Sequence, residues 1–69
     1  MNIIYIKFIN SVKMASRETQ HITSKEASLE LTKAGFFKVL ILDGRFQGET
    51  TLVPASNVCY CKVGEDNIK

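Results

Sequence analysis

The sequence predicts an α+β fold, a small antiparallel sheet of four to five strands with one short helix packed on one face. Segments rich in β-branched and aromatic residues recur along the chain, which indicates several short strands. Between the first two such segments, Thr23-Ser24-Lys25-Glu26 has the Thr-x-x-Glu spacing of a capping box, which marks the start of a helix. At 69 residues the chain has room for one domain, residues 1–69, with one modest core.

The first half of the chain predicts a strand, an ambiguous segment and the helix. Residues 2–10 are apolar and β-branched and predict a strand, whereas residues 12–22 are more polar and fit a second strand or an extended arm. The helix is expected from the capping box to about Ala34, and Gly35 is expected to end it in the left-handed conformation. Its apolar stripe would be Ala27, Leu31 and Ala34.

The second half predicts a hairpin and a closing strand. Residues 36–42 predict a strand, Asp43-Gly44 a type I′ turn, and residues 45–53 the return strand with Gly48 as a bulge. Residues 54–57 predict a turn and residues 58–63 the last strand. The polar residues 64–69 are expected to form a frayed tail.

Alternation along the strands predicts the core. Successive side chains of a strand point to opposite faces of a sheet, so one face of each of three strands would be apolar. The expected core consists of Ile4, Ile6, Phe8, Phe37, Val39, Ile41, Cys59, Cys61 and Val63, covered by the helix stripe and joined by Leu52.

The opposite face repeats an aromatic-x-Lys pattern in the same three strands. Tyr5-x-Lys7, Phe36-x-Lys38 and Tyr60-x-Lys62 each place a ring and a cation on one face. Rings can stack on unpaired bases while lysines meet phosphates, so the pattern predicts a surface for single-stranded nucleic acid. The predicted nucleic-acid-binding residues are Tyr5, Lys7, Lys13, Arg17, Phe36, Lys38, Arg45, Tyr60 and Lys62.

The same face also favours a different interpretation, because it carries much apolar surface. Its other side chains would be Ile3, Ile9, Leu40, Leu42 and Val58, more than solvent normally tolerates. The face would then be covered by residues 12–22, by a partner protein or by a second copy of the chain. A homodimer therefore remains an alternative.

Composition and charge bear on the class of protein. The net charge of +2 permits contact with phosphates without demanding it. Cys59 and Cys61 would lie about 7 Å apart along one strand, beyond the usual Cα separation of a disulfide. Reduced, buried thiols in a cytoplasmic protein are therefore expected. The apolar N-terminal segment is short and interrupted by Lys7, so neither a signal peptide nor a membrane span is expected.

Catalysis and cofactors are not predicted. A single histidine, His21, with two cysteines falls short of the four ligands of a structural zinc site, and no cofactor motif is present. No recognisable motif places a base beside a nucleophile. The sequence therefore predicts a binding protein rather than an enzyme.

Two resemblances extend these expectations. Residues 48–63 resemble the end of an SH3-type small barrel, in which a glycine, an apolar-proline turn with asparagine and a closing strand follow one another. The aromatic opening motif and the tryptophan of peptide-binding SH3 domains are absent, so this resemblance implies partial SH3-like closure without a proline-peptide groove.

Taken whole, the chain resembles the small early proteins of lytic Bacillus phages, from Ile3-Ile-Tyr-Ile-Lys7 through the capping box to Asp43-Gly44. That resemblance implies a host-takeover protein that binds host RNA or a host protein in the host cytoplasm. RNA is the first choice here, and an inhibitor or adaptor directed at a host protein is the alternative.

Overall fold

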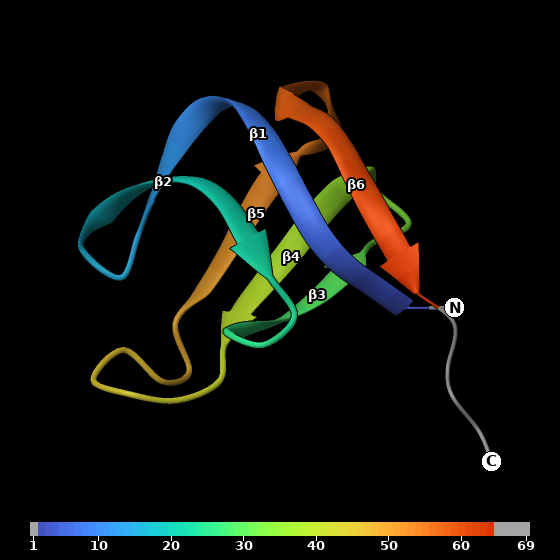
Figure 1. The fold of residues 1–69 in the computed structure, drawn as a ribbon. Helices are drawn as coiled ribbons and strands as arrows, with labels where there is room; N and C mark the ends of the chain where they lie inside the picture. The colour runs from blue at the N-terminus through green and yellow to red at the C-terminus, as the bar shows by residue number, and fades with distance from the viewer. Residues whose placement is uncertain (1, 65–69) are drawn as a thin grey trace, which may run out of the picture.

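The computed structural model describes residues 2–64, and these residues form an almost entirely β structure (Figure 1). The elements are β1 (Asn2–Met14), β2 (Arg17–Thr23), β3 (Ala27–Leu31), β4 (Phe36–Ile41), β5 (Thr50–Pro54), the 3₁₀-helix η1 (Ala55–Asn57) and β6 (Val58–Gly64). Residues 65–69 of the predicted tail lie outside the described part of the chain.

The strands form two antiparallel sheets that pack against each other. Sheet A has the strand order β2-β1-β6, and sheet B has the order β3-β4-β5. Figure 1 shows the strands of sheet A crossing in front of those of sheet B. The core between them consists of Ile6, Phe8, Met14, Ile22, Ala27, Phe37, Val39 and Val53, all buried.

The predicted helix is wrong, and with it the α+β class. Its capping box is a tight turn, in which the Thr23 hydroxyl donates to the Glu26 carboxylate over 3.3 Å and the Glu26 amide donates to the Thr23 carbonyl over 3.1 Å. The chain then continues as β3, whose residues pair with β4 from Ala27 opposite Ile41 to Leu31 opposite Phe37. Isolated helices of this length are marginal in water, whereas β3 gains a full ladder of hydrogen bonds from its neighbour.

The predicted two-residue hairpin at Asp43-Gly44 is also wrong, because residues 42–49 form a longer loop. The Gly48 amide donates to the Ile41 carbonyl, and the Ile41 amide donates to the Glu49 carbonyl, so two residues oppose one. Gly48 has a φ of 92°, the left-handed conformation that this type of bulge requires. The return strand β5 accordingly starts at Thr50, not at Arg45.

Two further bulges explain the errors in the predicted core. Between β1 and β6, Ile4 is an extra residue of β1, and Cys59 is an extra residue of β6. Each bulge changes which side chain faces inward, so Ile3 and Val58 pack against the core in place of Ile4 and Cys59.

Other predicted core residues are exposed because the two sheets do not overlap completely. Cys61 and Val63 lie on the core side of β6 and are nevertheless exposed, as is Leu31 at the end of β3. Ala34 is exposed in the turn between β3 and β4. Leu52 is exposed because it alternates with the buried Val53 and so points away from the core.

The side chain of Asn57, in η1, connects η1 to the backbone of β1. The Asn57 side-chain Nδ2 donates to the Asn10 backbone carbonyl over 3.0 Å, and the Asn57 side-chain Oδ1 accepts from the Asn10 backbone amide over 3.0 Å. Asn57 thus acts like a strand backbone where β1 and η1 meet. The 3₁₀-helix η1 lies within residues 48–63, the segment whose sequence resembles the end of an SH3-type barrel.

The start of β1 and the end of β6 also lie together. Asn2 of β1 pairs with Gly64 of β6, so the first and last described residues are neighbours in sheet A (Figure 1). A hydrogen bond joins the β1–β2 turn to the loop of residues 42–49, where the Ala15 amide donates to the Glu49 carboxylate over 2.7 Å.

Candidate nucleic-acid interface

The outer face of sheet A brings together aromatic and cationic side chains from all three of its strands. Lys7 of β1 lies opposite His21 of β2 on one side and Tyr60 of β6 on the other. Tyr5 lies opposite Lys62 of β6. Directly opposed residues share a face, so these five side chains form one surface, here named the tyrosine surface: Tyr5, Lys7, His21, Tyr60 and Lys62.

The three rings of the tyrosine surface form a stacked row across the sheet. The Tyr5 ring lies 5.5 Å from the His21 ring at an interplanar angle of 24°, and 5.9 Å from the Tyr60 ring at 27°. These distances fall in the range of favourable aromatic pairs. Because Tyr60 is 48% exposed and His21 is exposed, the row is open to solvent at both ends.

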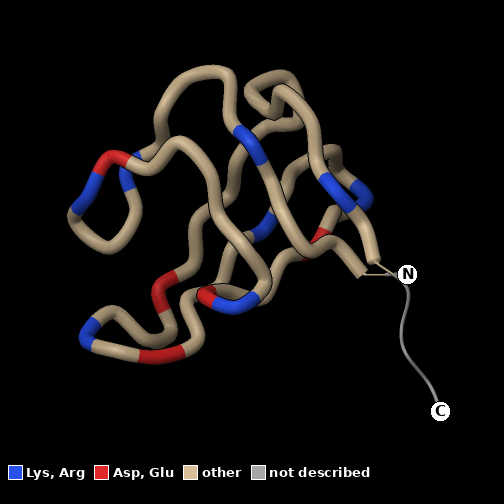
Figure 2. The backbone as a smooth tube through the Cα atoms, in the orientation of Figure 1, with Lys and Arg blue, Asp and Glu red and all other residues tan. Residues whose placement is uncertain are grey.

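Cations flank this row. The Lys62 ammonium lies 5.2 Å from the centre of the Tyr5 ring, within the range of a cation–π contact. Strands β1 and β6 contain no Asp or Glu. Figure 2 shows a basic position on each of these neighbouring strands and no acidic position along either of them. The surface is therefore suited to a negatively charged ligand with flat rings.

The tyrosine hydroxyls also interact. Desolvation raises the pKa of the Tyr5 phenol, and a hydrogen bond and charge repulsion from Tyr60 raise it further. Tyr5 therefore stays uncharged to a higher pH than an ordinary tyrosine, and it adds no negative charge to the surface near neutral pH.

The structure brings together four of the nine predicted site residues and separates the other five. Tyr5, Lys7, Tyr60 and Lys62 lie on the tyrosine surface, which also contains His21, a residue outside the predicted set. Residues 12–22 fit a second strand or an extended arm equally well, so their sequence assigns His21 to no face, although Thr19-x-His21-x-Thr23 has the alternation of a strand.

Phe36 and Lys38 lie on a different surface, the outer face of sheet B. Phe36 is opposite Pro54, and Lys38 is flanked by Glu30 and Leu52. We name the cluster of Phe36, Leu40, Leu52 and Pro54 the apolar surface. Leu52 is 56% exposed and Phe36 is 37% exposed. The prediction that all three aromatic-x-Lys pairs share one face is therefore wrong.

The remaining basic residues lie in hairpins and loops. Lys13 and Arg17 are near the tip of the β1–β2 hairpin, where Lys13 is directly opposite Glu18. Figure 2 shows basic and acidic positions side by side at this tip. Arg45, in the loop after β4, lies 5.7 Å from the Phe46 ring. None of these three extends the row of rings.

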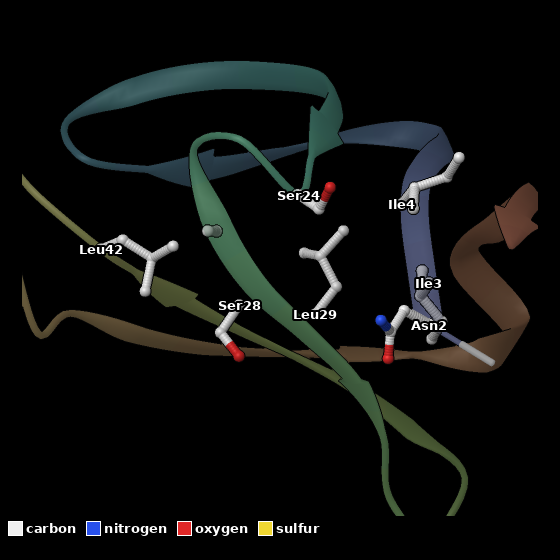
Figure 3. Close-up of a pocket in the computed structure, with 8 residues that line it drawn as sticks. Asn2, Ile3, Ile4, Ser24, Ser28, Leu29 and Leu42 are labelled. Carbon is white, nitrogen blue, oxygen red and sulfur yellow. The ribbon is translucent and has the colours of Figure 1, made fainter. Parts of the chain in front are cut away.

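A shallow pocket of about 380 Å³ lies where β1 approaches β3 (Figure 3). Its lining consists of Asn2, Ile3, Ile4, Ser24, Ala27, Ser28, Leu29 and Leu42. None of these side chains ionises, so the pocket offers no charge to hold a phosphate. It is a weaker candidate for an anionic ligand than the tyrosine surface.

Metal binding and membrane spanning find no support within residues 2–64. This part of the chain contains no cluster of three or more His, Cys, Asp or Glu side chains that could hold a metal ion. None of its segments forms a helix long and apolar enough to cross a membrane. Both cysteines are free and exposed, so the prediction of buried thiols is wrong.

Comparison with protein-family models, curated proteins and solved structures finds no match to this chain. The resemblances to SH3-type barrels and to phage early proteins therefore stay predictions.

Proposed function

We propose that the protein binds single-stranded RNA through the tyrosine surface, without catalysis, and modulates host metabolism in the host cytoplasm. The observation that carries this proposal is the row of His21, Tyr5 and Tyr60 rings with Lys7 and Lys62 beside it. Ring-bearing sheets bind unstacked bases, and base–aromatic stacking contributes about 1–3 kcal/mol per base.

Single strands fit this surface better than duplex DNA. Residues 2–64 contain no α-helix, so they offer no recognition helix to enter a major groove. The rings lie on a sheet and need splayed bases to stack on. The tyrosine hydroxyls and the His21 ring nitrogens can exchange hydrogen bonds with 2′-hydroxyls, which favours RNA over DNA.

Fluorescence anisotropy with a labelled single-stranded RNA, over a series of salt concentrations, tests the proposal. We expect binding at low salt that weakens as salt rises, with a slope of about −0.7 per phosphate contacted. A matched DNA strand should bind more weakly, and a duplex of the same length should bind least. Absence of binding at low salt, or an affinity that does not change with salt concentration, would contradict the proposal.

A second candidate function is an inhibitor or adaptor that binds a host protein through the apolar surface. The exposure of Phe36 and Leu52 on the outer face of sheet B favours it. Capture of a host protein from nuclease-treated lysate, lost with Leu52→Glu and kept with Tyr5→Ala, would support it. Partners that disappear after nuclease treatment would instead indicate a nucleic-acid bridge.

A further inference from the structure

Strand β6 is an edge strand whose side chains are exposed on both faces of the sheet. It lies at the edge of sheet A, and β1 is its neighbour on one side. All five residues from Cys59 to Val63 are exposed, including Cys61 and Val63 on the core side. The free edge of β6 therefore has no cover on either face within residues 2–64. Edge strands of this kind readily pair with another chain.

The other edges of the two sheets are better protected against pairing. Strand β2 carries Arg17 and Glu18, the short β3 carries Glu30, and the short β5 ends at Pro54. Charges, prolines and short length are common devices against edge pairing. Strand β6 has seven residues, two more than β3 or β5, and carries one charge, Lys62, where the equally long β2 carries Arg17 and Glu18. Self-association through an edge should therefore use β6.

The sequence of β6 selects one symmetric register. Antiparallel pairing that matches the two faces places the two-fold axis at a residue, and an axis at Tyr60, Cys61 or Lys62 lies inside the exposed run of residues 59–63. An axis at Lys62 would oppose two lysines, and an axis at Tyr60 would require the bulged Cys59 to pair next to the axis. An axis at Cys61 needs only the regular residues 60–62.

We propose that two copies of the chain pair through β6, antiparallel, with Cys61 opposite the partner's Cys61 at the two-fold axis. The three strands of sheet A would join those of the second copy in one continuous sheet. Tyr60 would lie opposite the partner's Lys62, so each tyrosine surface would gain a cation from the other copy. This pairing does not depend on RNA binding.

Sedimentation equilibrium under reducing conditions, at up to about 1 mM protein, tests the association, since that range covers weak interfaces. We expect a monomer–dimer equilibrium. A chain that stays monomeric over the whole range would overturn the proposal.

Cross-linking tests the register. Directly opposed residues of antiparallel strands are about 4.5–5.5 Å apart between Cα atoms, within disulfide range. The azo reagent diamide would take two protons and two electrons from the two Cys61 thiols, forming the disulfide and a hydrazine. We expect a covalent dimer with Cys59→Ser and none with Cys61→Ser. A covalent dimer that survives Cys61→Ser, or one that forms equally in the urea-unfolded chain, would overturn it.

Two lysine variants provide a matched pair in the reduced protein. Cys61→Lys would oppose two like charges at the axis and should raise the dimer dissociation constant about tenfold or more. Cys59→Lys adds the same charge at the bulge and should change it much less. Both residues are exposed, so thermal unfolding of the monomer should be similar in the two variants. Equal effects on the dimer would overturn the proposed axis.

Discussion

The two sheets use the same aromatic-x-Lys pattern with different results. In sheet A, Tyr5 lies between His21 and Tyr60, and Lys62 lies over its ring. In sheet B, Phe36 lies opposite Pro54, and Lys38 lies opposite the acidic Glu30. The neighbours on adjacent strands therefore decide whether such a pair forms part of a cationic, ring-bearing surface or of an apolar one.

The sheets also differ in their turns. The β1–β2 hairpin of sheet A turns through Ala15 and Ser16, which have φ values of 49° and 62°. In the loops of sheet B, glycines take the positive φ values at positions 35, 44 and 48. Residues with a Cβ atom are strained in this conformation, so sheet A keeps a less favourable turn than sheet B.

The largest expected effect separates the two aromatic positions. Tyr5→Ala should weaken binding to single-stranded RNA about 5- to 150-fold, because stacking on a ring contributes about 1–3 kcal/mol. Phe36→Ala should leave RNA affinity nearly unchanged, since Phe36 lies on the other sheet. Anisotropy titrations at fixed salt measure both. Equal losses would mean that RNA contacts both sheets.

The lysines provide the next comparison. The double variant Lys7→Gln/Lys62→Gln should reduce the salt slope of RNA binding by about 1.4, if each lysine meets one phosphate. Lys38→Gln should not change the slope, because Glu30 lies opposite Lys38 and offsets its charge. A slope that responds only to Lys38→Gln would place the ligand on sheet B.

A glycine introduced into the β1–β2 turn and a glycine removed from a loop of sheet B should change the free energy of unfolding in opposite directions. Ser16→Gly should raise the free energy of unfolding by about 1 kcal/mol, because glycine accepts a positive φ without strain. Gly44→Ala should lower it by about 1 kcal/mol, although a Cβ atom there would have no atom within 4 Å. Urea denaturation measures both changes. A loss of stability in Ser16→Gly would contradict the strain at this turn.

The smallest effect concerns the Tyr5 hydroxyl and alkaline pH. The pKa of Tyr5 is raised in the folded protein, so the unfolded chain loses this proton first. The free energy of unfolding should therefore fall as pH rises above about 10, the ordinary tyrosine value, and through the raised value. Urea denaturation from pH 8 to 11 should show a weaker fall in Tyr5→Phe. Identical pH profiles in the two proteins would contradict this coupling.

The sequence predicted the middle of the strands well and their ends poorly. Alternation correctly gave Ile6, Phe8, Phe37 and Val39 as core residues. It failed at Ile4 and Cys59, where bulges shift the alternation of the residues beyond them. Neither position is a glycine, so no local signal marks these bulges.

The predictions of the helix and of the binding site were wrong for a related reason. The capping-box side chains do contact each other, but pairing of β3 with β4 decides the conformation of the residues that follow. Likewise, the composition of a strand does not tell which sheet it joins. The Tyr5 and Tyr60 pairs could be predicted to share a face, whereas the assignment of Phe36 to the other sheet depends on long-range pairing.

The pairing of Asn2 with Gly64 has a consequence for the order in which the strands need to be connected. Because the two positions are adjacent, a short linker between them would close the backbone into a ring without disturbing either sheet. New ends opened in the loop of residues 42–49 would then give a circular permutant with the same strand pairings. In such a permutant β5 would come first and β4 last, and the tyrosine surface would be built from consecutive strands.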